Sequence, residues 1–496
     1  MLGAMFNLFS RSPYALLPSD NNSRQSARKY LTKRTIIFWT SAPAAFILFY
    51  FAVFRPLGLW KKSATPLAVA EVDDWRDYPE PPLPPDYEHI YEFERKLPQH
   101  NQSLPFPEGS TGRYFYSANH ADTSGWNNIL QEYIFLAHLA YASQRSFVFD
   151  PYEWDPKAKG KWSKFGDKVV PARIPLNALV SGPMAGGPVK NDRTMPRAVN
   201  KAYFDKVCPH PTVIPGDVVP EGVGSTDGNF IMVKWVKKLL TMTDRCIRLD
   251  GSNSQIFPYY VFGMASLIES WPWMSESPIL REFRWSPLVE SAVLKNLHRI
   301  VPSTTDEGYP DGQIQFPYKP IHGLLAVHIR RGDYIDHCWY LAHYAATFQG
   351  WNTFPEYVDK FQVPAGVANG TVTPEAMEVY MEHCLPNHAQ VLAKIASVRQ
   401  TPEAKGLKHI FIMTNAKADW ANELKDKLMA QGGWDTVTTS RDMHLSWEQK
   451  FISQAVDMLI GQRAQVFIGN GWSSLTSNTV LLRRSMDFLP RATRFW

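Results

Sequence analysis

The chain has 496 residues, of which 45% are hydrophobic and 20% are charged, and its formal net charge is +5. A composition of this kind predicts about two or three globular domains with sizeable apolar cores. The charge is small for the length, and the sequence contains no basic helix, zinc-finger spacing or platform of aromatic and basic residues. These features exclude nucleic-acid binding.

The N-terminal part of the chain predicts a membrane anchor. Residues 35–54 carry no charged side chain, and a helix of about 20 residues spans the roughly 30 Å core of a bilayer. Basic residues are more frequent before this segment than after it, which predicts a cytoplasmic tail over residues 1–34 and a lumenal remainder. A cleaved signal peptide is the alternative, but the apolar run is long for one and begins only at Thr35. We therefore expect a single-pass type II protein of the Golgi or endoplasmic reticulum membrane.

Residues 55–110 are rich in proline and charge, and this composition predicts an extended stalk. Proline fixes φ and removes a backbone donor, so such a segment does not form regular structure easily. Alternatively, the end of this segment packs on the globular part of the chain that follows, which we call the head. Sequons for N-glycosylation occur at Asn101 and Asn369, on the side of the anchor predicted to be lumenal.

The chain contains four cysteines and no Cys-x-x-Cys spacing. In an oxidising compartment this predicts disulfides and argues against a zinc or redox site. Three pairings are open, and the most local of them joins Cys208 to Cys246 and Cys338 to Cys384.

Residues 111–320 are predicted to form an N-terminal, Rossmann-like domain. Its opening elements are a strand at 112–116, a loop rich in Gly and Asn at 124–128, a helix at 129–143 and a strand at 146–150. This β–α–β order indicates an α/β domain. Residues 151–217 show little periodicity and are interpreted as irregular surface, with an acceptor-binding insertion as one interpretation.

Residues 321–496 are predicted to form a second Rossmann-like domain, in which strands and helices alternate regularly. In chain order the elements are strand 324–329, helix 374–397, strand 409–414, helix 419–430, helix 447–462 and strand 464–468. Such alternation implies a parallel sheet with right-handed crossovers. The fold class predicted for the head is therefore α/β, with two Rossmann-like domains facing a cleft.

The three strands predicted in the C-terminal domain end in polar loops. The loops are residues 328–333, 413–415 and 469–478. Because the carboxyl ends of parallel strands meet at one edge of a sheet, we expect these loops to line a common ligand site.

The first loop contains two adjacent arginines, Arg330 and Arg331. The guanidinium group is always charged and presents a planar fork of donors, so this pair suits a phosphate or a diphosphate. An internal ion pair with Asp333 is the alternative role for either arginine.

The third loop offers hydroxyl groups beside the start of a predicted helix. Ser473, Ser474 and Thr476 suit an anion at a helix N-terminus, and each is alternatively an N-cap of that helix. The sequence Gly-x-x-x-x-Gly-Lys-Ser/Thr is absent, which excludes an ordinary P-loop. Together with the arginines, these groups predict a diphosphate site.

Four segments resemble motifs of the fucosyltransferase superfamily that contains the α1,2-, α1,6- and protein O-fucosyltransferases. Residues 328–333 resemble its first motif, 411–415 its middle motif and 457–474 its third motif, and 124–128 resemble the Gly-x-Asn loop of the O-fucosyltransferase branch. The resemblance covers most of the head and leaves out the anchor, the stalk and residues 151–217.

The resemblance implies a GT-B architecture, GDP-fucose as the donor and an inverting transfer that needs neither a metal ion nor another cofactor. The donor-site residues that it implies are His328, Arg330, Arg331, Asp333, Asp457, Ser473 and Ser474.

Individual roles follow from the same resemblance. Arg330 is expected to grip the β-phosphate with Arg331 as its support, and Ser473 and Ser474 are expected to contact phosphate. Asp457 is expected to hydrogen-bond the guanine or the ribose. His328 is expected on the nucleoside side of the site, with a hydrogen-bonded core histidine as the alternative.

The catalytic base is left open by the sequence. Asn127 and Asn128 in the opening loop are predicted as catalytic-site residues, and Asn127 not as a base. Asp122 and Glu132 are the nearby carboxylates, with a capping or solvated role as the alternative for Glu132. Leu130 stands where the family often has an arginine, so the mechanism and the acceptor class stay open.

The predicted function is therefore a fucosyltransferase that moves fucose from GDP-fucose to a protein hydroxyl or a glycan in the secretory pathway. A membrane-tethered, inactive relative that binds glycan or nucleotide is the alternative. No nucleic-acid partner is expected.

Overall fold

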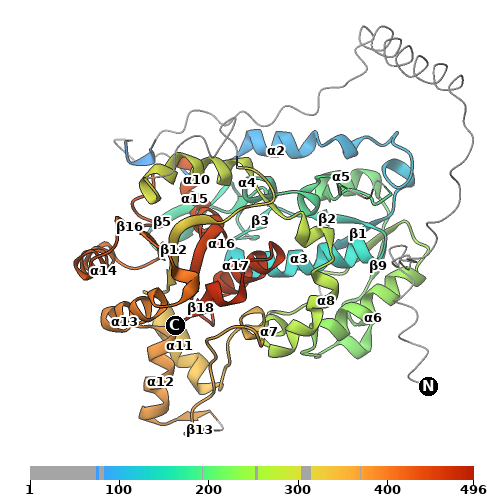
Figure 1. Ribbon diagram of the computed structural model, residues 1–496. Coiled ribbons are helices and arrows are strands. Elements are labelled where there is room, and N and C mark those ends of the chain that lie inside the picture. Colours follow the sequence, from blue (N-terminus) through green and yellow to red (C-terminus); the bar gives the residue numbers. More distant parts are fainter. Residues whose placement is uncertain are drawn as a thin grey trace, which may run out of the picture. The chain divides into compact units, whose positions relative to one another are not determined.

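A computed structural model describes residues 74–77, 83–190, 192, 194–251, 255–302, 314–368 and 370–496. The predicted cytoplasmic tail, the predicted anchor and Asn369 lie outside these ranges. Within them, no helix has the length and apolar character needed to cross a membrane. The described residues belong to one compact unit that contains two parallel sheets (Figure 1).

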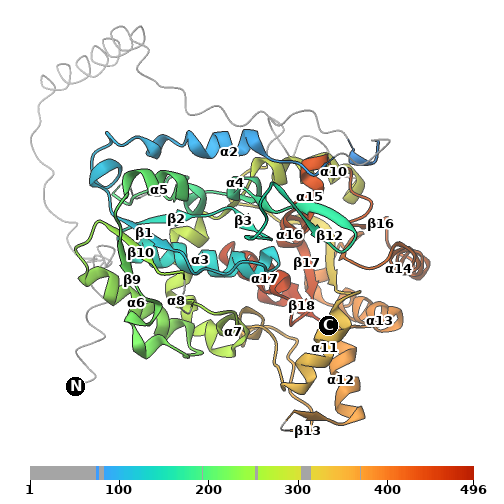
Figure 2. The same cartoon turned by 180° about the vertical axis from the view of Figure 1, so that it is seen from behind.

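The first sheet has five parallel strands in the order β8-β2-β1-β10-β9, and we call its surroundings the N-terminal lobe. The strands are β1 (Tyr114–Ser117), β2 (Ser146–Phe149), β8 (Val199–Asn200), β9 (Thr212–Ile214) and β10 (Cys246–Leu249). Helix α3 (Trp126–Ala142) lies on one face of this sheet and α5 (Lys201–Val207) on the other (Figures 1 and 2). Strands covered on both faces are mostly apolar, and every residue of β1 and β2 is buried.

The N-terminal lobe differs from the sequence-based expectation in two places. Helix α3 begins at Trp126 and not at Ile129, because the Gly125 loop leads directly into its first turn. Residues 151–217, predicted as irregular, contain two short hairpins and supply β8 and β9 to the sheet. These strands have two and three residues, too few for a periodic pattern to be recognised.

The remaining elements of this half are short, apart from one helix, α6, that covers the sheet beside α3. They are β3 (Tyr152–Glu153), β4 (Trp162–Phe165), β5 (Lys168–Pro171), β6 (Arg173–Ile174), α4 (Leu176–Leu179), β7 (Val180–Ser181), α6 (Gly228–Thr241), α7 (Tyr259–Gly263), α8 (Trp271–Met274), α9 (Pro278–Arg281) and β11 (Arg284–Trp285).

The second sheet also has five parallel strands, in the order β16-β15-β12-β17-β18, and forms the C-terminal lobe. The strands are β12 (Ile321–Ile329), β15 (His409–Thr414), β16 (Thr436–Thr439), β17 (Ala464–Gly469) and β18 (Thr493–Phe495). The chain starts in the middle of this sheet, moves to one edge and then crosses to the other side of β12. The crevice between β12 and β17 is therefore the topological switch point, where open parallel sheets bind their ligands.

Helices and one hairpin complete this lobe. They are α10 (Pro287–Ile300), α11 (Tyr334–His343), β13 (Val367–Ala368), β14 (Thr371–Val372), α12 (Pro374–Cys384), α13 (His388–Arg399), α14 (Ala418–Gln431), α15 (Trp447–Phe451), α16 (Ser453–Arg463) and α17 (Ser474–Ser485). The single helix predicted over residues 374–397 is wrong, because Pro386 cannot continue it and Asn387 caps a new helix. The helix predicted over residues 447–462 is likewise interrupted, at Ile452.

Both disulfides join cysteines that are consecutive among the four in the chain, 38 and 46 residues apart. Cys208 pairs with Cys246, which ties the end of α5 to β10, and Cys338 pairs with Cys384, which ties α11 to the end of α12. Of the three pairings that the sequence leaves open, the structure has the most local one.

The end of the segment predicted as a stalk packs on the head. Helix α2 (Glu88–Arg95) follows Tyr87, whose buried hydroxyl donates to the carbonyl of Glu448 at 2.7 Å. Buried Gln99 donates from Nε2 to the carbonyls of Gly186 and Ala198, at 3.0 and 2.6 Å. Residues from Leu83 onward are therefore part of the head.

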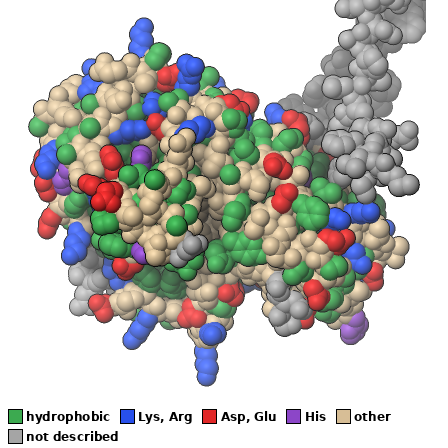
Figure 3. All heavy atoms as spheres, turned by 90° about the horizontal axis from the view of Figure 1, so that it is seen from below, with side chains coloured by type: hydrophobic (Ala, Val, Ile, Leu, Met, Phe, Trp, Pro, Cys, Tyr) green, Lys and Arg blue, Asp and Glu red, His purple; other side chains and the backbone are tan. Residues whose placement is uncertain are grey.

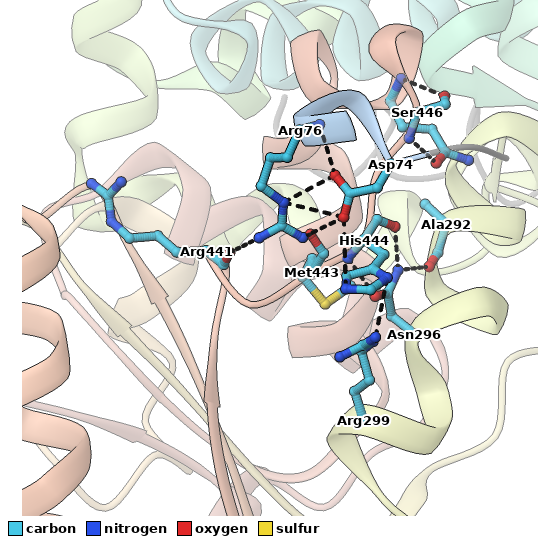
Figure 4. Close-up of polar contacts among 10 residues, drawn as sticks. Asp74, Arg76, Ala292, Asn296, Arg299, Arg441, Met443, His444 and Ser446 are labelled. Carbon is cyan, nitrogen blue, oxygen red and sulfur yellow. Dashed lines mark hydrogen bonds and ion pairs between the residues drawn. The ribbon is translucent and has the colours of Figure 1, made fainter. Parts of the chain in front are cut away.

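A short stretch, Asp74–Asp77, is also held on the C-terminal lobe (Figure 4). Arg76 binds the carboxylate of Asp74 and donates to the carbonyls of Arg441 and Met443, at 3.0 and 2.9 Å. The same carboxylate lies 3.6 Å from Nε2 of His444. The chain thus reaches the head beside the loop that follows β16.

Candidate active site

The three polar strand ends of the C-terminal lobe meet at one edge, as the parallel arrangement predicts. Ile329 at the end of β12 lies opposite Thr414 on β15, and Val327 lies opposite Ile468 on β17. Beyond the strands, Asn415 bridges the first two loops. Its Oδ1 accepts from the backbone N–H of Arg331 at 2.8 Å.

Arg330 has few partners within the protein. Its guanidinium lies over the ring of Tyr334, 4.7 Å from the ring centre, and Nη2 is 3.4 Å from Oδ2 of Asp333. Asp333 is 74% exposed, and an ion pair of this length and exposure contributes little to stability. The side chain of Arg330 is 29% exposed, and its Nη1 donates to no atom of the described residues. Arg330 therefore keeps donors for a ligand.

Arg331 is engaged by the protein itself. Its guanidinium donates to the carbonyls of Leu385 (3.2 Å) and Pro386 and lies over Trp420, 4.2 Å from the ring centre. Burial lowers the pKa of Arg331 to about 10. The two arginines therefore differ in role. Arg331 holds the connection between α12 and α13, whereas the guanidinium of Arg330 is left for a ligand.

His328 joins the first loop to the third. Its Nδ1 lies 2.8 Å from Oγ1 of Thr476, which also accepts from the backbone N–H of Asn470 at 3.0 Å. Burial, with a smaller effect of the Arg330 charge, lowers the pKa of His328 to about 3. The imidazole is therefore neutral at physiological pH. Thr476 lies within α17 and binds His328, so it is not an N-cap.

The third loop ends in a helix N-terminus with free hydroxyl groups. Ser473 occupies the N-cap position of α17, but its side chain makes no capping hydrogen bond. Gly471, two residues before Ser473, is so closely packed that an added Cβ would lie 2.2 Å from the ring of Phe348. The backbone N–H groups of residues 474–476, in the first turn of α17, and the Ser473 hydroxyl are available to an anion.

Asp457 lies on α16 near the same edge of the sheet. Its Oδ2 accepts from the hydroxyl of Ser440, which follows β16, at 2.7 Å. Burial raises the pKa of Asp457 to about 7, although the hydrogen bond from Ser440 lowers it.

The N-terminal lobe meets the third loop through the Gly–Asn loop. Nδ2 of Asn478 on α17 donates to the backbone carbonyl of Asn127 at 2.8 Å and to its Oδ1 at 3.1 Å. Asn128 is placed by its backbone N–H, which donates to the carbonyl of Gly125 at 2.9 Å. The structure therefore brings Asn127 to the start of α17, one turn beyond Ser474.

A cluster in the N-terminal lobe includes residues that the sequence analysis missed. His120 lies 2.9 Å from Oδ2 of Asp150, and its Nδ1 lies 2.9 Å from the carbonyl of Ala121. Glu132 is buried and accepts from the N–H of Ala121 at 2.5 Å. The only signal in the sequence was the position of Asp150 at the end of a predicted strand.

The cluster holds the loop between β1 and α3. Asp122, in the same loop, accepts from the hydroxyl of Thr123 at 3.3 Å. Of the two candidate bases, Glu132 is thus bound to the backbone of this loop, whereas Asp122 belongs to the loop itself. Across the described residues, no group of three or more His, Cys, Asp or Glu side chains is arranged to hold a metal ion.

The contribution of this cluster to stability is expected to fall as pH rises, because two of its groups bind protons more tightly in the folded state. Burial raises the pKa of Glu132 to about 7, although His120 and the N–H of Ala121 lower it. Burial disfavours the charged form of His120, but the hydrogen bond and charge of Asp150 outweigh it and raise its pKa to about 9. The contribution of Glu132 is lost between about pH 4.5 and 7, and that of His120 between about pH 6.5 and 9.

The measurement is the free energy of unfolding of the wild type and of Glu132→Gln between pH 5 and 9. The difference in this free energy between the wild type and Glu132→Gln should change by about 1–3 kcal/mol between pH 5 and 7, to the disadvantage of the wild type. The difference isolates Glu132, because other buried carboxyls with a raised pKa, such as Asp457, titrate in both proteins. A difference that does not change with pH would contradict the role of Glu132.

The surface is hollowed on the face seen from the side of α12 and β13 (Figure 3). Large side chains at the end of α11, which follows the first loop directly, and just after it are exposed: Trp339 by 49%, Tyr340 by 51% and Tyr344 by 68%. The rings of Tyr340 and Tyr344 lie 4.3 Å apart between their centres.

Comparison with known proteins gives one family and several solved structures. The family model described as GDP-fucose protein O-fucosyltransferase matches residues 213–486, more than half of the chain. The structure of POFUT1 in complex with GDP-fucose is 14% identical, with a TM-score of 0.45 over 78% of this chain and 98% of that chain. NodZ alpha-1,6-fucosyltransferase soaked with GDP-fucose is 12% identical, with a TM-score of 0.35 over 75% and 92% of the two chains. No curated protein matches the chain in sequence.

Proposed function

The chain belongs to the GDP-fucose protein O-fucosyltransferase family and is a fucosyltransferase, and from this premise we propose that it transfers fucose from GDP-fucose with inversion and without a metal ion. The proposed acceptor is a protein hydroxyl or a glycan of the secretory pathway. We propose a GT-B arrangement, with the donor on the C-terminal lobe and the acceptor on the N-terminal lobe.

One observation carries the proposal most directly: Arg330 keeps an exposed, unpaired Nη1 at the switch point of the C-terminal sheet. The neighbouring strand β17 leads into Ser473, whose hydroxyl makes no capping hydrogen bond, and into the N-terminus of α17. A diphosphate between these groups would receive charged and neutral hydrogen bonds from fixed positions. Such donors stabilise the charge that develops on a leaving group.

In the proposed reaction, the oxygen of the acceptor hydroxyl bonds to the anomeric carbon of fucose while the bond from that carbon to the β-phosphate oxygen breaks. GDP leaves with the electron pair, and the hydroxyl proton passes to a base on the acceptor side. Asp122 is the candidate for this base, since Glu132 is bound to the loop backbone. An amide accepts protons poorly, so Asn127 is assigned to binding.

The proposed setting is the lumen of the Golgi or the endoplasmic reticulum, with residues 35–54 as a type II anchor. Two disulfides support an oxidising compartment. The exposed side chain of Asn101 is a suitable glycosylation acceptor in that compartment.

The test is donor binding and turnover by the full-length chain in detergent. We expect GDP-fucose to bind, as measured by calorimetry, and GDP to be released slowly with water as the acceptor, at the same rate in EDTA. Absence of binding would contradict the donor assignment. Activity lost in EDTA and restored by a divalent ion would contradict metal independence.

A further inference from the structure

The two lobes are joined at the candidate site by a contact between two buried asparagines. Asn478 is fully buried on α17, and Asn127 is 6% exposed in the first turn of α3. Nδ2 of Asn478 is 2.8 Å from the backbone carbonyl oxygen of Asn127 and 3.1 Å from its side-chain oxygen. One amide group of the C-terminal lobe thus holds both oxygens of a residue of the N-terminal lobe.

This contact determines which way both amides point. A backbone carbonyl can only accept a hydrogen bond, so the atom of Asn478 that faces it must be the NH₂ group. The side-chain atom of Asn127 that faces the same NH₂ group must then be the oxygen. The amide orientation of Asn127 therefore follows from the chemistry of its neighbour, although nitrogen and oxygen have nearly equal size.

The remaining end of the Asn127 amide is its NH₂ group. This group donates to no other atom of the described residues, and it is not among their enclosed, unpartnered polar atoms. It lies at the N-terminus of α3, beside the α17 turn that carries Ser473 and Ser474. Two N–H donors are therefore left for a ligand between the lobes.

We propose that Asn478 is a positioning residue for the transfer reaction, acting through Asn127. It holds the Asn127 amide so that N–H groups, and not the oxygen, face the bound sugar nucleotide or acceptor. A rotation of this amide by 180° would place lone pairs against oxygens of the substrate. This role rests on the proposed function, and it makes the contact between the lobes a condition for a competent site.

In this role, Asn478 should matter for turnover and hardly at all for donor binding. Arg330 and the start of α17 belong to the C-terminal lobe and are expected to hold GDP without Asn127. Loss of Asn478 should therefore lower kcat for GDP release from GDP-fucose by about 10- to 100-fold, the range of one or two hydrogen bonds. The dissociation constant of GDP should change by less than about 3-fold.

Two substitutions at Asn478 test the proposal in the full-length chain. Asn478→Asp keeps the shape but faces two acceptor oxygens without a donor, and Asn478→Ala removes the group. Both should reduce kcat and keep the affinity for GDP. Asn296→Ala is the matched control, because Asn296 is equally buried and donates to the carbonyls of Ala292 and His444, at 2.9 and 2.7 Å (Figure 4). It should lower the melting temperature without a selective loss of kcat.

The decisive measurement repeats Asn478→Ala in an Asn127→Ala background. If Asn478 acts through Asn127, the second substitution should cost less than about 2-fold in kcat. A full additional loss would overturn the proposal and would indicate a general role in joining the lobes. Turnover at the wild-type rate by Asn478→Asp would also overturn the proposal, and so would a loss of GDP affinity equal to the loss of kcat. A wild-type chain that does not turn over GDP-fucose would contradict the proposed function as well.

Discussion

Replacing Arg330 by alanine is expected to lower kcat/KM for GDP-fucose by about two to three orders of magnitude, equivalent to about 3–4 kcal/mol of transition-state stabilisation. The reason is that the guanidinium is 29% exposed and makes only a long contact with Asp333, through Nη2, so its other donors are available to the diphosphate. Arg330→Lys should recover part of the loss, because it keeps the charge and lacks the fork. Initial rates of GDP release over a range of donor concentrations measure this effect.

Two other arginines serve as controls for Arg330. Arg399 also lies over an indole, 4.2 Å from the ring centre of Trp434, and donates to the carbonyl of Gly432 at 2.9 Å. It is the last residue of α13 and comes before β15, away from the carboxyl edge of the sheet, so Arg399→Ala should leave kcat/KM unchanged. Arg331→Ala should mainly reduce stability, because it removes donors from two backbone carbonyls. Unaltered kinetics of Arg330→Ala would contradict the assignment.

The largest effect on stability is expected for Arg483→Met, a loss of about 3–5 kcal/mol in the free energy of unfolding. Arg483 is fully buried, and its Nη1 donates to the carbonyls of Gly461, Gln462 and Ala464, at 3.1, 3.1 and 2.6 Å. These carbonyls lie at the C-terminus of α16, where a cation is favoured. Methionine fills the volume but leaves the carbonyls buried without donors.

Denaturant unfolding of the full-length chain measures this loss, with Arg491→Met as the control. Arg491 is exposed and lies two residues before β18, so its replacement should change the free energy of unfolding by less than about 0.5 kcal/mol. A change below about 1 kcal/mol in Arg483→Met would contradict the role of the buried guanidinium. Because β17 follows α16 directly, the same variant should also weaken GDP binding, in contrast to a purely catalytic defect.

Long, apolar strands were predictable because their pattern is local. β12, β15 and β17 each contain an apolar run, and all three occur within three residues of the expected bounds. β8 and β9 were missed because two or three residues carry no pattern, and their place in the sheet comes from pairing with β2 and β10. The long helix expected over residues 374–397 overlooked Pro386, a local signal that was present in the sequence.

The features of the candidate site likewise fall into those that could be predicted from the sequence and those that could not. Its chemistry could be predicted, because adjacent arginines after a strand and hydroxyls before a helix are local features. The different environments of Arg330 and Arg331 could not, since Trp420 and the carbonyls of Leu385 and Pro386 approach from distant parts of the chain. His120 and Asp150, the partners of Glu132 in its cluster, were missed for the same reason.

The sequence by itself determined the α/β class, the polar loops at the strand ends and, through its motifs, the GDP-fucose-dependent family. These depend on residue types at short spacing, which a chain carries before it folds. Only the tertiary structure decided which arginine is free for a ligand, which cysteines pair and which way the Asn127 amide points. Each of these depends on groups far apart in the chain, such as Asn127 and Asn478, because burial and hydrogen bonding are set by neighbours in space.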